Sequence, residues 1–220
     1  MKTQFVKIAA FGFALSFVYS CSSDNDSSNP VSSSSSYKQS SSSSSGSSLQ
    51  QSSDSEKYKT VKIGEQIWMA ENLNNDVAGS RCYGDNTANC EKYGRLYDWE
   101  TAKMVCPDGW HLPSNAEWQI LVDLAGGRNA AGKALKATSG WNTGSGYKLG
   151  TDDFGFAALP GGEGYSGSFD SAGDRGYWWS ATENANSAYN RYMLYNDASV
   201  TSSNYSVKAM LYSVRCLQDK

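Results

Sequence analysis

The single histidine of the chain limits the acid–base chemistry that its side chains can perform. A serine hydrolase would need His111 as its general base and a carboxylate, such as Asp108 or Glu117, to orient the ring. His111 lies, however, between Trp110 and a Leu-Pro pair, at the entry of a predicted helix. Packing explains a histidine in that position. We therefore expect no catalytic residues and no enzyme activity, with an enzyme of unknown type as the remaining alternative.

Acidic residues gather in the glycine-rich part of the chain, where two chemistries would use them. Glycoside hydrolysis needs two carboxyl groups about 5–9 Å apart, and calcium takes about six to eight oxygen ligands. The sequence does not give that distance, and it contains no EF-hand spacing. We expect no cofactor and no metal ion, with calcium kept as an alternative. The acids concerned are Asp152, Asp153, Glu163, Asp170 and Asp174.

Two short motifs resemble nucleotide sites. Residues 162–167 match G-x-G-x-x-G, but a dinucleotide site also needs a preceding strand and a following helix, and neither is predicted here. Residues 153–155 read Asp-Phe-Gly, yet the chain has no His-Arg-Asp loop and is too short for a kinase domain. Neither motif therefore indicates a nucleotide ligand.

Aromatic residues give the main indication of a binding surface. Four tryptophans with apolar neighbours are expected in the core, namely Trp68, Trp99, Trp110 and Trp118. Later aromatics lie among Asn, Ser and Gly, which favours binding because tyrosine offers a large contact area at low entropic cost. We predict the ligand surface on residues 141–177 and 189–195, the alternative being solvent-facing tyrosines without a partner. The predicted ligand-binding residues are Trp141, Tyr147, Tyr165, Tyr189, Tyr192 and Tyr195.

Five cysteines are present, and one of them, Cys21, follows the apolar N-terminal segment. The other four suit two disulfides in an exported domain. Of three possible pairings we favour Cys82–Cys90, which closes a polar, turn-rich loop, together with Cys106–Cys216, which fastens the C-terminus to the middle of the domain. A zinc site is disfavoured because the chain has no C-x2-C pair and only one histidine.

The spacing of apolar residues predicts the elements that position these groups. Residues 58–63 and 66–70 predict an opening β-hairpin, and residues 96–104 a short helix that ends before Pro107. A second helix begins after Ser114, because Ser114 and Glu117 form a capping box ahead of an apolar stripe. Two glycines at 126 and 127 end that helix.

The second half of the domain has a different pattern. Eleven of the 21 glycines fall within residues 140–176, which predicts long irregular loops there. Strands are expected at residues 177–180, 189–195 and 207–217. The fold class is therefore α+β, with early helices and a late antiparallel sheet.

The N-terminus predicts export. Residues 1–20 read as a signal peptide whose apolar run, residues 8–18, is too short to cross a bilayer as a helix. Val18-Tyr-Ser-Cys21 resembles the bacterial lipobox, which predicts acylation of Cys21; an ordinary signal peptide is the alternative. Residues 21–55 then form a disordered tether, since 20 serines in the 34 positions after Cys21 leave too little to bury. We expect a lipid anchor in the bacterial envelope, at the outer membrane.

The remaining residues, 56–220, form one domain of ordinary size. Its formal charge is −3, the same as that of the whole chain, because residues 1–55 contain three Lys and three Asp. A nucleic-acid partner is therefore not expected.

Six sequence blocks, in order along residues 58–219, resemble the Fibrobacter succinogenes major paralogous domain. The resemblance implies an exported bacterial domain and no particular activity. The blocks are Val61–Leu73, Tyr93–Tyr97, Cys106–Trp118, Gly155–Gly162, Tyr177–Thr182 and Ser213–Cys216.

The block Trp110–Trp118 also resembles the start of a helix in formylglycine-generating enzymes, whose fold is related to C-type lectin domains. This implies a C-type-lectin-like, disulfide-stapled fold with long loops. The copper-binding cysteine pair of those enzymes is not implied, because every cysteine already has another assignment. Of the lectin calcium motifs, only residues 195–197 are similar. We expect a binding module for carbohydrate or a surface protein, or else a purely structural envelope module.

Overall fold

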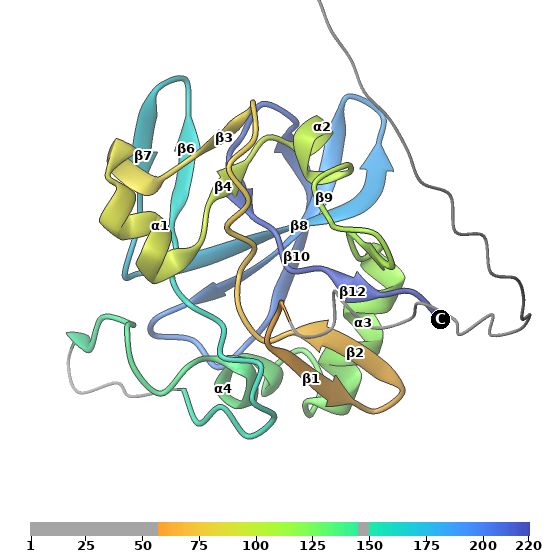
Figure 1. Cartoon of the computed structure of the whole chain (residues 1–220). Coiled ribbons are helices and arrows are strands. Elements are labelled where there is room, and N and C mark those ends of the chain that lie inside the picture. The colour runs from red at the N-terminus through yellow and green to blue at the C-terminus, as the bar shows by residue number, and fades with distance from the viewer. Residues whose placement is uncertain (1–56, 145–149) are drawn as a thin grey trace, which may run out of the picture. The chain divides into compact units, whose positions relative to one another are not determined.

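The last part of the chain supplies strands to two different sheets (Figure 1). The structure is a computed structural model and describes residues 57–144 and 150–220. Its helices are α1 (Thr87–Tyr93), α2 (Trp99–Ala102), α3 (Asn115–Leu124) and α4 (Ala131–Leu135), with a 3-10 turn at Tyr83–Asp85. Its early strands are β1 (Thr60–Ile63), β2 (Gln66–Met69), β3 (Ser80–Arg81), β4 (Leu96–Tyr97) and β5 (Trp110–His111). Its later strands are β6 (Glu163–Tyr165), β7 (Ser168–Asp170), β8 (Arg175–Asn184), β9 (Ser187–Leu194), β10 (Thr201–Val207), β11 (Tyr212–Ser213) and β12 (Leu217–Gln218).

The larger sheet has six strands in the order β10-β9-β8-β11-β4-β3, and the smaller has four in the order β1-β2-β12-β5. Pairing is antiparallel except between β11 and β8, where Ser213 lies beside Trp178 in parallel. The α+β class predicted from the sequence is confirmed. The large sheet was expected to contain strands of the second half of the domain, but β3 and β4 from the first half extend it.

The opening hairpin and the capped helix are confirmed. Strands β1 and β2 pair from Thr60–Met69 to Ile63–Gln66, and Gly64 turns the chain with a φ of 61°. At the start of α3 the Ser114 side chain accepts from the Glu117 N–H, while the Glu117 carboxylate accepts from the Ser114 N–H. The helix is therefore fastened at its first turn by the capping box that the sequence predicted.

Other local predictions were wrong in extent. The helix expected over residues 96–104 shrinks to α2, because its first residues pair with β3 and β11 as strand β4. The loop inside Cys82–Cys90 contains the 3-10 turn and half of α1. The strand expected at 207–217 is divided among β10, β11 and β12, since the chain changes sheets there.

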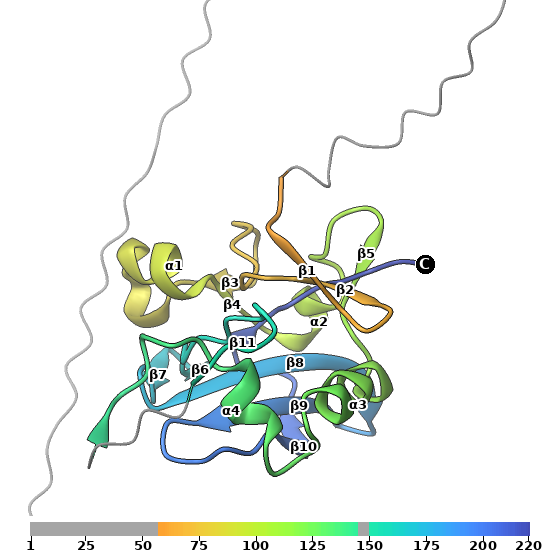
Figure 2. The same ribbon diagram turned by 90° about the horizontal axis from the view of Figure 1, so that it is seen from below.

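Two groups of buried side chains form the interior. The first core packs α3 and α4 against one face of β8 and β9 (Figure 2), and it brings Trp68, Trp118 and Trp178 together. The second core packs the region of α2 against the opposite face, around Trp99 and Trp179. The four tryptophans expected in the core are buried: Trp68, Trp99, Trp110 and Trp118 are 0, 1, 7 and 0 % exposed.

Both predicted disulfides are present. Cys82–Cys90 closes a short loop, with a sequence separation of 8, and Cys106–Cys216 joins positions that are 110 apart. The longer bridge is buried in the second core at Cys216. On the loop-entropy model it restricts the unfolded chain more than the short one does.

Two buried cations bond backbone carbonyls of segments that are far apart in the sequence. The Arg215 guanidinium is 0 % exposed and donates to the carbonyls of Met69 and Phe156 and to the Asn72 amide oxygen. Burial lowers its pKa to about 9. The Lys136 ammonium donates to the carbonyls of Leu194 and Asp197, at 2.7 and 2.6 Å. Burial lowers the pKa of Lys136 to about 8, so it is still charged at neutral pH.

Candidate functional site

The face of β8 and β9 that points away from the first core carries the candidate site. Residues of β9 alternate, so that Arg191 and Met193 face α3 and the first core, whereas Asn190 and Tyr192 lie on the opposite face. A hollow of about 380 Å³ opens on that face, which we call the tyrosine pocket. No helix residue of the described ranges lines it. Its lining residues are Glu163, Arg175, Tyr177, Asn190, Tyr192, Leu194, Ser203, Ser206 and Tyr212.

Three tyrosine rings form a row across the strands in this pocket. Tyr177 and Tyr192 are direct cross-strand partners with ring centroids 5.7 Å apart. On the other side the Tyr177 ring stacks on Tyr212, at 4.9 Å and an interplanar angle of 13°. Tyr212 also contacts Trp179 of the second core. This contact fixes the row on the side that faces the core. Burial raises the pKa of both Tyr177 and Tyr212, which keeps their hydroxyls protonated.

Two charged side chains lie beside the rings. Arg175 is exposed and donates from Nη1 to the Tyr177 hydroxyl, at 3.1 Å. Burial raises the pKa of Glu163, and the nearby Asp170 adds to this, while Arg175 opposes it. Within the described residues, neither Arg175 nor Glu163 has an ion-pair partner within 4.0 Å. The pocket therefore offers a guanidinium and a carboxyl group to a ligand.

An amide at the pocket wall is incompletely bonded. Asn190 is 1 % exposed, and its Nδ2 donates to the Ser206 hydroxyl, which lies 3.2 Å from the Tyr212 hydroxyl. Its Oδ1 has no hydrogen-bond partner among the described residues. A buried acceptor without a partner costs about 1–3 kcal/mol. A donor group that reaches this oxygen would recover part of that cost.

The residues predicted to bind ligand are not brought together. Tyr192 lines the tyrosine pocket. Tyr165 is 50 % exposed at the end of β6, and Tyr189 alternates with Asn190, which places it on the other face of β9. Trp141 packs against the first core and donates from its indole to the Ala158 carbonyl. The remaining two also lie apart: Tyr195 follows β9 near Gly144, and Tyr147 lies outside the described residues.

Arg175 and Tyr177 lie within the predicted segment 141–177 but were not among the residues named for binding, Tyr212 lies outside both predicted segments, and Glu163 was grouped with solvated loop acids. The two strands do contain a signal. Arg175 and Tyr177 are two residues apart on β8, and Asn190, Tyr192 and Leu194 are spaced by two residues along β9. Alternation places each set on one face. The sequence does not say that β11 pairs beside β8, and this pairing is what adds Tyr212 to the row.

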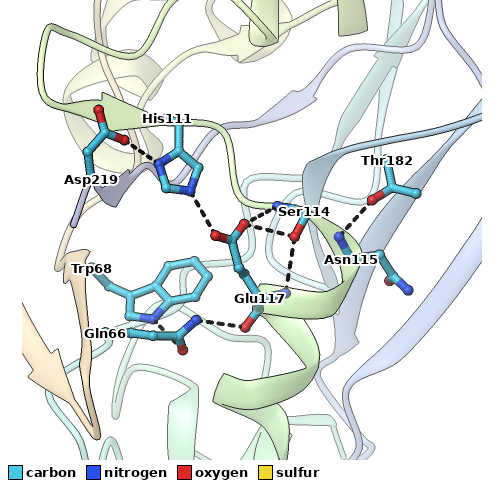
Figure 3. A network of polar contacts seen from close by, with 8 residues as sticks. All are labelled: Gln66, Trp68, His111, Ser114, Asn115, Glu117, Thr182 and Asp219. Atoms are coloured by element: carbon cyan, nitrogen blue, oxygen red, sulfur yellow. Dashed lines mark hydrogen bonds and ion pairs between the residues drawn. The ribbon is translucent and has the colours of Figure 1, made fainter.

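The single histidine belongs to a separate polar network (Figure 3). His111 Nδ1 lies 2.5 Å from the Asp219 carboxylate, and Nε2 lies 3.0 Å from the Glu117 carboxylate. Burial tends to raise the pKa of Glu117, but hydrogen bonds from Ser114 and contact with His111 outweigh it, so the pKa is lowered. Both ring nitrogens are therefore occupied by carboxylates. The histidine joins the C-terminal segment to the start of α3.

Two of the loop acids considered for calcium or glycoside chemistry form hydrogen bonds within the domain. Asp152 accepts from the Ala157 N–H, and Asp174 accepts from the Asn142 amide. Across residues 57–144 and 150–220, no three His, Cys, Asp or Glu residues converge in a way that would hold a metal ion. The G-x-G-x-x-G segment is a hairpin: β6 and β7 are joined by Ser166 and Gly167, both with positive φ, as a tight two-residue turn requires.

The predictions for residues 1–55, including the signal peptide and Cys21, lie outside the described residues. Among the helices that are described, none is long and apolar enough to span a membrane.

Comparison with known proteins gives one match. No curated protein and no solved structure matches the chain. The model of the Fibrobacter succinogenes major domain family matches residues 61–218, from the second residue of β1 to the end of β12. The match covers both sheets and the tyrosine pocket. The chain therefore belongs to the Fibrobacter succinogenes major domain family.

Proposed function

We propose that this chain is a non-catalytic binding module of the bacterial envelope that binds carbohydrate in the tyrosine pocket. One observation carries the proposal: a row of three tyrosines, in which Tyr192 is partly exposed while Tyr177 and Tyr212 belong to the second core, borders a hollow beside a guanidinium and a carboxyl group that have no ion-pair partner among the described residues. A saccharide presents apolar C–H faces together with many hydroxyls. Aromatic rings suit the first, and charged or amide side chains suit the second.

The size of the hollow favours a saccharide over a protein partner. Its volume, about 380 Å³, lies at the lower end of the range of small-molecule sites. A protein interface of ordinary size buries about 800 Å² on each partner. The pocket thus supports carbohydrate as the first choice between the two ligand classes considered from the sequence.

We also propose the location and the finer fold. Residues 1–20 are a signal peptide, Cys21 is acylated and held at the outer membrane, and residues 21–55 tether the domain. A two-disulfide domain suits an oxidising, exported setting. The fold is C-type-lectin-like, a proposal supported by the short helices, the long loops and the fastened C-terminus. In this arrangement the membrane is a partner through lipid alone.

A glycan array probed with the full chain in detergent tests the function. We expect binding to a restricted set of saccharides, weakened about tenfold or more by Tyr192→Ala. Tyr189→Ala on the opposite face of β9 is the matched control and should bind as the unchanged chain does. If no glycan is captured, or if both variants bind equally, carbohydrate binding in this pocket is wrong and a structural envelope module replaces it.

Fractionation of cells tests the anchor. Cys21→Ser should release the protein from the membrane fraction and remove the mass of the acyl chains, because a lipid anchor requires that thiol. Unchanged mass and unchanged membrane association would contradict the lipoprotein proposal.

A further inference from the structure

Arg175 differs in how its charge is used from Arg81, Arg95, Arg191 and Arg215, while Arg128 is also exposed but lies outside the tyrosine pocket. Arg81 and Arg95 form ion pairs with Asp85 and Asp76. Arg191 and Arg215 are buried, and both donate to backbone and amide oxygens. Arg175 is exposed, and the Tyr177 hydroxyl is its one side-chain acceptor among the described residues. Most of its donors therefore face the tyrosine pocket or solvent.

The bond to Tyr177 gives this guanidinium a defined orientation. Arg175 and Tyr177 are two residues apart on β8, so their Cα atoms lie about 7 Å apart on the same face of the sheet. The tyrosine that stacks in the row thus also holds the arginine. A guanidinium offers a planar fork of donors that matches a carboxylate in two parallel hydrogen bonds.

We propose that the tyrosine pocket selects saccharides that carry a carboxylate, and that Arg175 is the residue that recognises this group. The inference rests on the proposed function, because it assumes that the pocket binds a saccharide. It adds the chemical class of that saccharide, namely a uronic acid or a similar acidic sugar. Arg175 is then the specificity-determining residue, and the tyrosine row supplies binding that neutral sugars share.

Glu163 makes this selection depend on pH. Its carboxyl group is faced by Arg175 and Tyr177 on β8, by Tyr212 on β11 and by Asp170 on β7. Burial raises the pKa of Glu163, so protonation begins at a higher pH than for a solvated glutamate. An ionised Glu163 repels the ligand carboxylate, whereas a protonated one does not. Binding of the acidic sugar should therefore strengthen as the pH falls towards the pKa of Glu163.

Matched pairs of saccharides test the inference. Oligosaccharides of galacturonic and glucuronic acid are compared with their methyl esters by titration calorimetry on the full chain, since each pair differs only at the carboxyl group, which is uncharged and methylated in the ester. We expect the acid to bind about tenfold more tightly than the ester. Arg175→Gln should remove that difference, because it weakens binding of the acid more than binding of the ester. Arg128→Gln removes an exposed arginine outside the pocket and should keep the full difference.

Variants of Arg175 and Glu163 distinguish a wrong role for these residues from a wrong proposed function. Arg175→Lys should keep part of the preference, because it retains the charge without the fork. Glu163→Gln should flatten the pH dependence of acid binding. If acid and ester bind equally, or if Arg175→Gln keeps the preference, the role of Arg175 is wrong and carbohydrate binding still stands. If neither form binds, and the array also captures no saccharide, the proposed function fails as well.

Discussion

The two faces of the β8–β9 ribbon are made by alternate residues of the same strands, yet they differ in what their charged side chains bond to. On the inner face, Trp178 and Met193 are 0 % exposed and packed in the first core, and Arg191 donates to Asn115 and Gln119, with its Nε left without a partner among the described residues. On the outer face, Arg175 lacks a carboxylate partner and Asn190 keeps one oxygen without a partner. Helices α3 and α4 cover the inner face, whereas on the outer face α2 packs around Trp179 and leaves the tyrosine pocket uncovered.

This difference separates residues that hold the fold from residues that are free to bind. Side chains of the inner face have their contacts and most of their hydrogen bonds within the domain, so changing them should cost stability. Side chains of the outer face keep groups to which a ligand can bond, so changing them should cost binding. The two costs are expected on opposite sides of one ribbon, which makes the comparison testable one residue at a time.

Removal of a core ring should have the largest effect. Trp118 is 0 % exposed and contacts Trp68, Phe156 and Trp178, so Trp118→Ala leaves a large cavity. We expect it to lower the free energy of unfolding by about 3–5 kcal/mol. Urea denaturation followed by fluorescence measures this. A loss below about 1 kcal/mol would mean that the inner face does not dominate stability.

The two arginines of the ribbon provide the sharpest contrast. Arg191→Gln should lower the free energy of unfolding by about 1–3 kcal/mol, because it removes the charged donor that bonds Asn115 and Gln119 to β9. Arg175→Gln, on the exposed rim, should change it by less than about 0.5 kcal/mol. The same denaturation experiment compares both. Equal losses would remove the distinction between the faces.

The tyrosines of β9 test the outer face in binding. Tyr192→Ala should weaken saccharide binding by about 1–3 kcal/mol, since it removes one end of the ring row. Tyr189→Ala should leave the affinity unchanged, because Tyr189 lies on the inner side of the strand. Calorimetry with a saccharide identified on the array measures both. If Tyr189→Ala alone weakens binding, the ligand lies on the inner face and the proposed site is wrong.

The smallest effect concerns the cap of α3, the helix that covers the inner face. Because the pKa of Glu117 is lowered in the folded domain, its ionised form stabilises the fold above the ordinary value of 4.5. That stabilisation is lost as the pH falls through the lowered pKa. Glu117→Gln should cost about 1 kcal/mol at neutral pH and reduce the acid sensitivity. Glu65→Gln, an exposed carboxylate on the first hairpin turn, is the control for both.

Local patterns allowed the strongest elements to be predicted. The capping box at Ser114 and Glu117, the opening hairpin and the alternation of β9 all depend on neighbours a few residues apart. The disulfide between Cys82 and Cys90 was predicted for the same reason. The predictions that failed concerned segments that pair with strands far away in the sequence. Leu96 joins a strand in place of a helix because β3 and β11 lie on either side of it, and no local pattern encodes that.

The same limit applies to the candidate site. Tyrosines among polar residues were taken as one surface, but strand alternation divides Tyr189 from Tyr192. Tyr212 enters the row only through the parallel pairing of β11 with β8. Glu163 enters because the β6–β7 hairpin folds back beside β11, where Gly164 bridges to Leu211. Composition indicated a binding surface in the second half, and only the topology gives its members.

The hydrogen bonds of Lys136 concern how the domain responds to dissolved calcium. Its ammonium lies between two backbone carbonyls of the loop after β9, an environment of oxygen ligands such as a divalent cation would bind. This segment thus receives its positive charge from the chain itself, and we expect its stability not to depend on dissolved calcium. Thermal unfolding should be unchanged by a chelator.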